Sequence, residues 1–375
     1  MTDRKLSILA ATAVILAGWA VLQNRLAHRT GAHRTALRAP LIQGLAPEAI
    51  ARITVASEQG ANTVTLTRTN GRFTVAEKDG YPANISAVNR LLSDCLDIRA
   101  AEHITSNADN HAELGVTEQT ARYVVRFFNA DGDEIAGIMV SETSPDRQGA
   151  FARLTAGDDT YFIQNPPWLS TGASDYVNTA LIEADSQTIR QVTVRGPEGE
   201  YVLKMADDEQ TIVLEGMPQD KQFKGTAYRT VFRALSSLRF EDVAAAGNAP
   251  DDLVFDRSYV CRLADSTVYT LLLAEHEDTT YATVTAEFMD TAPVQIGRED
   301  SPEELKKKEA KLLAMDAAKE FAQRHKGWVY TLSSWKADDL TKPLDELLED
   351  KPEPEPAGAA GEQTAADQAP ESDEN

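Results

Sequence analysis

The sequence predicts an α+β fold in which an N-terminal transmembrane helix is followed by two tandem similar lobes, each an antiparallel meander plus a helix. Two observations carry this prediction. An uncharged apolar run occupies residues 6–22, and the apolar periodicity of the following chain repeats after about 140 residues. With 375 residues and 42% apolar content, the chain is long enough for each lobe to bury a core.

The apolar run from Leu6 to Leu22 is preceded by Arg4 and Lys5. The run is slightly shorter than the roughly 20 residues of a membrane-spanning helix. Three interpretations therefore compete: a membrane anchor, a signal peptide and a buried core helix. Flanking charge argues against a core helix, and the bulky Trp19 interrupts the small residues that a cleavage site requires. We expect residues 1–40 to form an uncleaved membrane anchor and a basic stalk.

Four arginines follow the anchor at a spacing that places them near one face of a continuing helix: Arg25, Arg29, Arg34 and Arg38. They are candidate contacts for anionic lipid headgroups. The alternative is a solvated stalk that is broken at Gly31 and ends at Pro40. By the positive-inside rule, this many arginines favours a bulk domain in the cytoplasm.

The repeat is visible as two strand-like segments with period-two alternation, in which Ile53 and Val55 align with Val192 and Val194. Each is followed by two further strand-like segments and by an amphipathic helix. The aligned helical faces, which we expect to be core, are Val88, Leu91, Leu92, Cys95 and Ile98 in one copy and Tyr228, Val231, Phe232, Leu235 and Leu238 in the other. The repeat therefore predicts a first α+β lobe over residues 41–184 and a second over residues 185–349.

The second lobe carries a predicted helical insertion at residues 290–327. Ser301 and Glu304 form a capping-box pattern around Pro302, and a basic turn precedes Gly327, so both ends of a helix are marked. This helix either packs on its lobe with a solvated lysine face or serves as a docking element. Its expected apolar side consists of Leu305, Leu312, Met315 and Ala318. Residues 350–375 are acidic and rich in Pro and Ala, which predicts a disordered tail.

The charge balance and the missing motifs exclude several classes of function. A net charge of -22 opposes binding to nucleic acid. Cys95 and Cys261 are too few for a disulfide scaffold and have no metal-ligand spacing. No P-loop, GxGxxG, GxSxG or HExxH pattern occurs. We therefore predict no catalytic residue, no cofactor and no metal ligand.

Two polar segments carry residues of the kinds that bind metal ions. His103 and His111 flank an Asn- and Asp-rich segment, but no third ligand is evident, which favours a solvated loop that caps the following segment. The segment from Asn129 begins like an EF-hand loop but has Glu134 where glycine is needed and Val140 in place of the bidentate glutamate. A hairpin turn is the better interpretation.

The chain resembles the bacterial family named domain of unknown function 4340. The resemblance rests on the basic start and short anchor, LAPEAIARITV at Leu45, NGRFTV at Asn70, YPANISAVNRLLSDCLDI at Tyr81, TSNADNHAELGV at Thr105 and YFIQNPP at Tyr161. It covers the chain from about the anchor to Leu348. Two departures are Phe73, where a Trp is frequent, and the many arginines after the anchor. The resemblance implies anchoring in the bacterial inner membrane with an extracytoplasmic bulk domain, and genes often adjacent to ABC-type permeases and auxiliary transporter proteins.

Two functional hypotheses follow. The first is a membrane-anchored, non-enzymatic accessory or scaffold protein of an ABC-type transport system, whose partners are the membrane and a permease or auxiliary subunits. The second is a cell-envelope hydrolase with carboxylate catalysis in a cleft between the lobes. We place the bulk domain outside the cytoplasm, following the resemblance against the arginine count.

Overall fold

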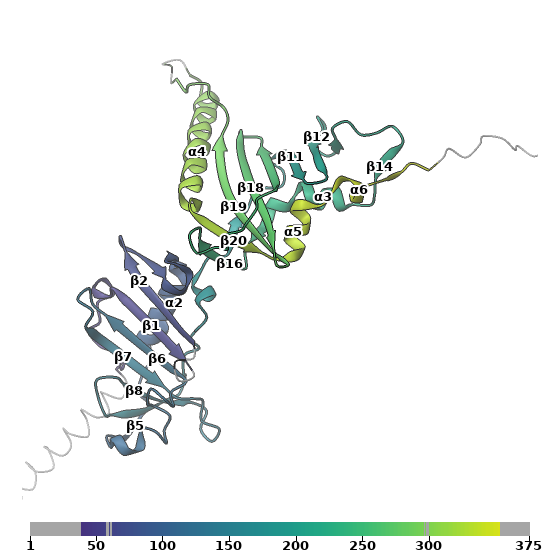
Figure 1. The fold of residues 1–375 in the computed structure, drawn as a ribbon. Coiled ribbons are helices and arrows are strands. Elements are labelled where there is room, and N and C mark those ends of the chain that lie inside the picture. Colours follow the sequence, from purple (N-terminus) through teal and green to yellow (C-terminus); the bar gives the residue numbers. More distant parts are fainter. Residues whose placement is uncertain (1–38, 58–59, 61, 296, 298–299, 353–375) are drawn as a thin grey trace, which may run out of the picture.

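The computed structural model describes residues 39–352, except 58–59, 61, 296 and 298–299. Two large antiparallel sheets dominate it, one lower and one upper in Figure 1. The first sheet has the order β4-β3-β2-β1-β6-β7-β8-β9-β5. Its strands are β1 (Arg52–Ser57), β2 (Asn62–Thr69), β3 (Arg72–Val75), β4 (Tyr81–Pro82), β5 (Glu102–Thr105), β6 (Tyr123–Phe128), β7 (Glu134–Val140), β8 (Ala150–Leu154) and β9 (Thr160–Ile163).

The second sheet has the order β13-β12-β11-β17-β18-β19-β20-β16. Its strands are β11 (Ile189–Gly196), β12 (Gly199–Met205), β13 (Ile212–Leu214), β16 (Asp242–Ala245), β17 (Arg257–Leu263), β18 (Thr267–His276), β19 (Thr279–Phe288) and β20 (Trp328–Leu332). Apart from the edge strand β4, the two sheets have the same strand order. Strands β1–β3 of the first sheet correspond to β11–β13 of the second, β5 corresponds to β16, and β6–β9 correspond to β17–β20. The aligned residues Ile53, Val55, Val192 and Val194 are all buried, as the alternation predicts.

Within residues 39–352, two small sheets and five α-helices accompany the large sheets. The small sheets pair β10 (Ala180–Ile182) with β15 (Leu238–Arg239) and β14 (Lys221–Phe223) with β21 (Leu348–Asp350). The helices are α2 (Ile85–Leu96), α3 (Ala227–Phe232), α4 (Pro302–His325), α5 (Ser334–Thr341) and α6 (Leu344–Leu347). Short 3-10 turns are η1 (Pro47–Ala49), η3 (Ala76–Lys78), η4 (Ala108–Asn110), η5 (Ala173–Tyr176) and η6 (Ala234–Ser237).

The helices of the two lobes differ although their apolar stripes align. The side chain of Asn84 caps α2 by accepting hydrogen bonds from the backbone amides of Ser86 and Ala87, and α2 continues for 12 residues. In contrast, α3 has no side-chain cap at Thr226 and ends after 6 residues, and the chain continues as η6 and β15. The second predicted helix is thus only half formed, although Leu235 and Leu238 are buried as predicted.

The predicted fold class is wrong in two respects. The described part of the chain is mostly antiparallel sheet with few helices, because the strands after each helix form most of each lobe. The transmembrane helix expected at the N-terminus is not part of this fold: the run at residues 6–22 and the arginines Arg25, Arg29, Arg34 and Arg38 lie outside the described residues. None of the helices within residues 39–352 combines the length and the apolar character needed to cross a membrane.

The start of the predicted tail is ordered. Asp350 belongs to β21, where its carboxylate lies 2.7 Å from the ammonium of Lys221, and the backbone amide of Lys351 donates to the carbonyl of Asp220. Residues 353–375 lie outside the described part of the chain.

Candidate functional site

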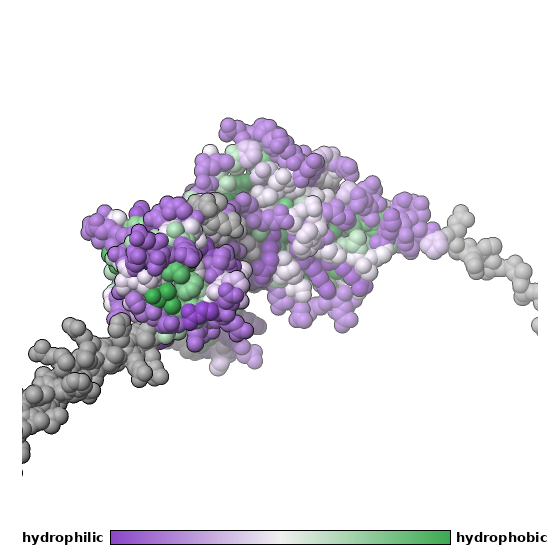
Figure 2. Space-filling view, turned by 90° about the horizontal axis from the view of Figure 1, so that it is seen from below, coloured by the Kyte–Doolittle hydropathy of each residue, from purple (hydrophilic) through white to green (hydrophobic). Residues whose placement is uncertain are grey.

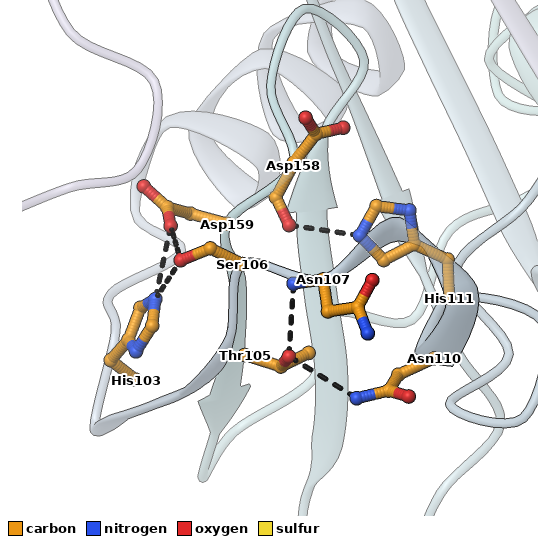
Figure 3. Close-up of polar contacts among 8 residues, drawn as sticks. All are labelled: His103, Thr105, Ser106, Asn107, Asn110, His111, Asp158 and Asp159. Carbon is orange, nitrogen blue, oxygen red and sulfur yellow. Dashed lines mark hydrogen bonds and ion pairs between the residues drawn. The ribbon is translucent and has the colours of Figure 1, made fainter.

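The Asn- and Asp-rich segment between β5 and β6 brings a serine, a histidine and an aspartate together (Figure 3). Ser106 Oγ donates to Asp159 Oδ1 at 2.5 Å, and His103 Nε2 lies 3.0 Å from the same carboxylate oxygen. The hydroxyl of Ser106 also lies 3.2 Å from His103 Nε2. In a catalytic triad the serine and the carboxylate contact opposite nitrogens of the imidazole: one nitrogen takes the serine proton, and the carboxylate at the other orients the ring and stabilises the imidazolium. Here both contact Nε2, and this arrangement does not activate the serine.

His111 has a different set of contacts from His103, although both flank the same segment. Its Nε2 lies 2.8 Å from the carbonyl oxygen of Asp158, and its side chain is buried (Figure 3). Thr105 Oγ1 accepts hydrogen bonds from the backbone amide of Asn107 and from the side chain of Asn110. These contacts hold the loop together through side-chain and backbone hydrogen bonds. Within the described residues, no group of three or more His, Cys, Asp or Glu side chains is placed to hold a metal ion.

The EF-hand-like segment forms the hairpin turn between β6 and β7. Asn129 Oδ1 accepts a hydrogen bond from the amide of Asp133 at 2.8 Å, and Gly132 has φ 89°, a left-handed conformation that glycine adopts readily. The predicted turn at Asp131-Gly132 is confirmed.

The junction between the lobes is built by the short segment that connects β3 to β4. Asp79, at φ 54°, accepts hydrogen bonds from the backbone amide of Ala245 at 2.8 Å and from the side chain of Asn248 at 2.7 Å. Next to it, the ammonium of Lys78 lies 2.6 Å from the carboxylate of Asp242. These contacts bind the first lobe to β16, the edge strand of the second sheet. They join residues more than 160 positions apart in the sequence.

Tyr81 places its buried ring among aromatic residues of the second lobe. The ring centroids of Tyr81 and Trp328 are 4.9 Å apart in an edge-on arrangement, and Phe240 lies at 5.9 Å. The Tyr81 hydroxyl is hydrogen-bonded to that of Tyr330. Buried residues of both lobes consequently belong to one continuous hydrophobic core. Sequence analysis missed this junction, because neither Asp79 nor Tyr81 carries a local pattern that identifies a distant partner.

A pocket of about 520 Å³ lies beside this junction and is lined by residues of both lobes, among them Tyr81, Asn84, Glu183, Arg324 and His325. Glu183 is the single carboxylate in its lining. A glycoside hydrolase of the usual kind needs two carboxylates facing each other across the scissile bond. Asp339 has a pKa raised by burial, but this residue lies on α5 beside Lys336 and outside this pocket.

His325 is a buried titratable group beside the aromatic cluster of the junction. Its Nδ1 lies 2.7 Å from the hydroxyl of Tyr330, and its ring packs on Phe321 at a centroid distance of 4.2 Å. Burial, together with the neighbouring charge of Arg324, lowers the pKa of this imidazole to about 4. The imidazole is therefore neutral at physiological pH. It joins α4 to the aromatic cluster at the lobe junction.

The predicted insertion helix is confirmed as α4. Ser301 Oγ accepts from the amide of Glu304, and the Glu304 carboxylate accepts from the amide of Ser301, which is the capping box expected from the sequence. Two of its lysines are not free in solvent. Lys308 contacts the carboxylate of Asp300 at 2.6 Å, and Lys311 contacts that of Asp290 at 2.7 Å. The hydrogen bonds from these lysines lower the pKa of both carboxyl groups and fasten the preceding loop to the helix.

The apolar side predicted for α4 is largely not a packing surface. Of its four residues, only Ala318 is buried, and the helix packs on its lobe mainly through its C-terminal half. The exposed apolar side chains of α4 are Leu305, Leu312 and Leu313 in its N-terminal half and Met315 just beyond the middle. Leu313 is 63% exposed. Most of the surface in the view of Figure 2 is hydrophilic. Clustered apolar side chains on a polar surface are typical of a protein-binding site.

The fold and these sites define a two-lobed β-sheet protein with a helical insertion in the second lobe. The family model described as "Domain of unknown function (DUF4340)" matches residues 74–257, and the chain belongs to this family. The match confirms the resemblance and extends from β3 to β17, across the lobe junction. Comparisons with curated proteins and with solved structures find no match.

Proposed function

We propose that the protein is a non-enzymatic accessory subunit of a bacterial ABC-type transport system. In this proposal it acts at the inner membrane, with its two lobes outside the cytoplasm. The observation that carries the proposal is the exposed apolar surface of α4, defined by Leu305, Leu312, Leu313 and Met315, on a body whose lobes are joined by a continuous core. A rigid body that presents an apolar helix suits a docking subunit.

The polar clusters support a binding role over the alternative of a hydrolase. Ser106 and Asp159 share one nitrogen of His103, and the pocket at the junction offers Glu183 as its one carboxylate. Neither arrangement supplies the acid and base pair that hydrolysis requires. The apolar surface of α4, in contrast, has the chemistry of a protein contact.

The test is a pull-down of the tagged full-length protein from membranes in mild detergent, with bound proteins identified by mass spectrometry. The wild type should recover an ABC-type permease in stoichiometric amount. The double variant Leu312→Glu and Leu313→Glu should lose it, because two carboxylates would have to be desolvated at the contact. Val254→Glu is the control, since Val254 is 70% exposed, against 63% for Leu313, but lies in a loop of the second lobe. Recovery of the protein alone would refute the accessory role.

The membrane side is tested separately by an enzyme reporter fused after Asn375. A reporter that is active only outside the cytoplasm, such as alkaline phosphatase, should be active in this fusion. Activity of a cytoplasm-specific reporter instead would place the lobes on the inner side, as the arginine count favours.

A further inference from the structure

One strand of the second sheet has an outer edge that is only partly paired. β19 pairs with β18 along its whole length, from Thr279 to Phe288. On its other side β20 pairs only with the segment from Thr280 to Ala282. Within the described residues, the segment Thr283–Phe288 therefore has a strand neighbour on one side only. We call this segment the open edge of β19.

The first lobe shows what a complete pairing looks like at the equivalent position. There β8 pairs with β7 on one side and with β9 from Ala150 to Arg153 on the other, which covers nearly all of its length. In the second lobe the insertion that contains α4 separates β19 from β20, and β20 is too short to cover the extended β19. Every second residue of an open edge directs its N–H and C=O groups outward, and these groups need hydrogen-bond partners.

A groove of about 790 Å³ runs between the open edge and the C-terminal half of α4. Figure 1 shows α4 standing beside β19 above the short β20. All six residues of the open edge line this groove, together with Met315, Ala322 and Trp328. A strand edge beside an apolar groove is the geometry that accepts an added strand: the edge binds the peptide backbone, and the groove receives alternate side chains.

The charges around the groove indicate what kind of segment fits. Lys319 and Lys326 line it on the helix side, and Glu287 is the one carboxylate in its lining. Two cations against one anion make the groove basic, whereas the whole chain carries a net charge of -22. A bound segment with acidic residues would be attracted to this position and repelled from the remaining surface.

We propose that the open edge of β19 binds an extended segment of a partner protein, in which apolar and acidic residues alternate, by adding it as a further strand of the second sheet. The inference rests on the proposed function only in that the protein acts by binding another protein. The groove shares Met315 with the apolar surface of α4, but Leu312 and Leu313 do not line it. The variants at Leu312 and Leu313 and the variants in the groove therefore test the two ideas separately.

The experiment is a selection of displayed octapeptides that alternate Val, Ile or Leu with Glu or Asp, performed on the full-length protein. Ala322→Arg places a long side chain into the groove and serves for counter-selection. Ala317→Arg is the matched control, because Ala317 is exposed on the same helix and does not line the groove. Peptides enriched on the wild type are then synthesised, and their binding is measured by fluorescence polarisation.

Binding of an enriched peptide should weaken at least about tenfold when alternate backbone nitrogens are N-methylated, since two or more hydrogen bonds are lost. Ala322→Arg should have an effect of the same size, and Ala317→Arg should have none. Lys319→Glu, an exposed change that leaves the core intact, should also weaken binding, whereas Lys307→Glu should not. The proposal is overturned if no peptide is enriched over Ala322→Arg, or if N-methylation leaves the affinity unchanged. Loss of the permease in the pull-down would not bear on these outcomes.

Discussion

Acidification should destabilise the folded protein through His325. The folded imidazole has a pKa of about 4, because it is buried next to Tyr330 and close to Arg324. In the unfolded chain it regains its ordinary pKa near 6.5. Between these two values the unfolded state binds more protons than the folded state, so the free energy of unfolding falls as the pH falls from 6.5 toward 4. Above pH 6.5 both states are neutral, and this contribution to stability is fully present.

The size of the effect follows from the two pKa values. Relative to pH 8, the loss in the free energy of unfolding is about 2 kcal/mol at pH 5 and about 3 kcal/mol at pH 4. Carboxyl groups with lowered pKa values, such as those of Asp290 and Asp300, add a further loss, but most of it falls below pH 4.5. The range from pH 4.5 to 6.5 is therefore the window in which His325 dominates.

The assay is urea unfolding of the wild type and of His325→Asn at a series of pH values between 4 and 8. Asparagine keeps a polar atom near the position of Nδ1 but does not titrate. The carboxyl groups are common to both proteins, so their contribution cancels when the two free energies of unfolding are subtracted. This difference in the free energy of unfolding should shrink by about 2 kcal/mol from pH 8 to pH 5. A difference that stays constant within about 0.5 kcal/mol over this range would show that the buried imidazole is not held neutral.

Three further predictions concern single contacts. Ser301→Ala removes the cap of α4 and should lower the free energy of unfolding by about 1 kcal/mol in urea titrations, while Ser301→Asp should restore most of it; an equal loss in both variants would speak against the cap. Asp79→Ala should lower the melting temperature more than Asp79→Gly, because both lose the bonds to Ala245 and Asn248 but only alanine is strained at φ 54°; equal melting temperatures would contradict the strain. The buried thiols of Cys95 and Cys261, whose pKa burial raises to about 12, should react with a thiol reagent only after unfolding; rapid labelling of the native protein would disprove their burial.

Local patterns in the sequence identified the elements whose signals are themselves local. The helix α4 was predicted with its capping box, because Ser301 and Glu304 contact each other within one turn. The apolar stripe of α2 could be predicted because its helical spacing is local: four of the five positions are buried within one helix, and the fifth, Ile98, lies two residues beyond its end. Strand alternation likewise placed Ile53 and Val192 in the interior.

The features that depend on distant partners could not be predicted in this way. The contact of Asp79 with β16 joins residues 166 positions apart, and an exposed Asp-Gly turn carries no sign of it. The prediction that the apolar side of α4 packs on its lobe is largely wrong, because helical spacing alone does not show whether other residues cover that side. The open edge of β19 exists because β20, which follows the insertion, is short. The apolar periodicity of the sequence does not indicate how far two strands pair. The second helix ends at Phe232 and the chain continues as η6, an end point that the aligned apolar stripe does not indicate.

The continuous core at the junction has a mechanical consequence. Lobes connected by a flexible linker move independently, so a force applied to one lobe is not transmitted to the other. Here Tyr81 is held among the aromatic rings of the second lobe, and the segment beside it is bonded to β16. A displacement of α4 by a partner would therefore turn the whole molecule as a stiff lever, and heat should melt both sheets in a single transition.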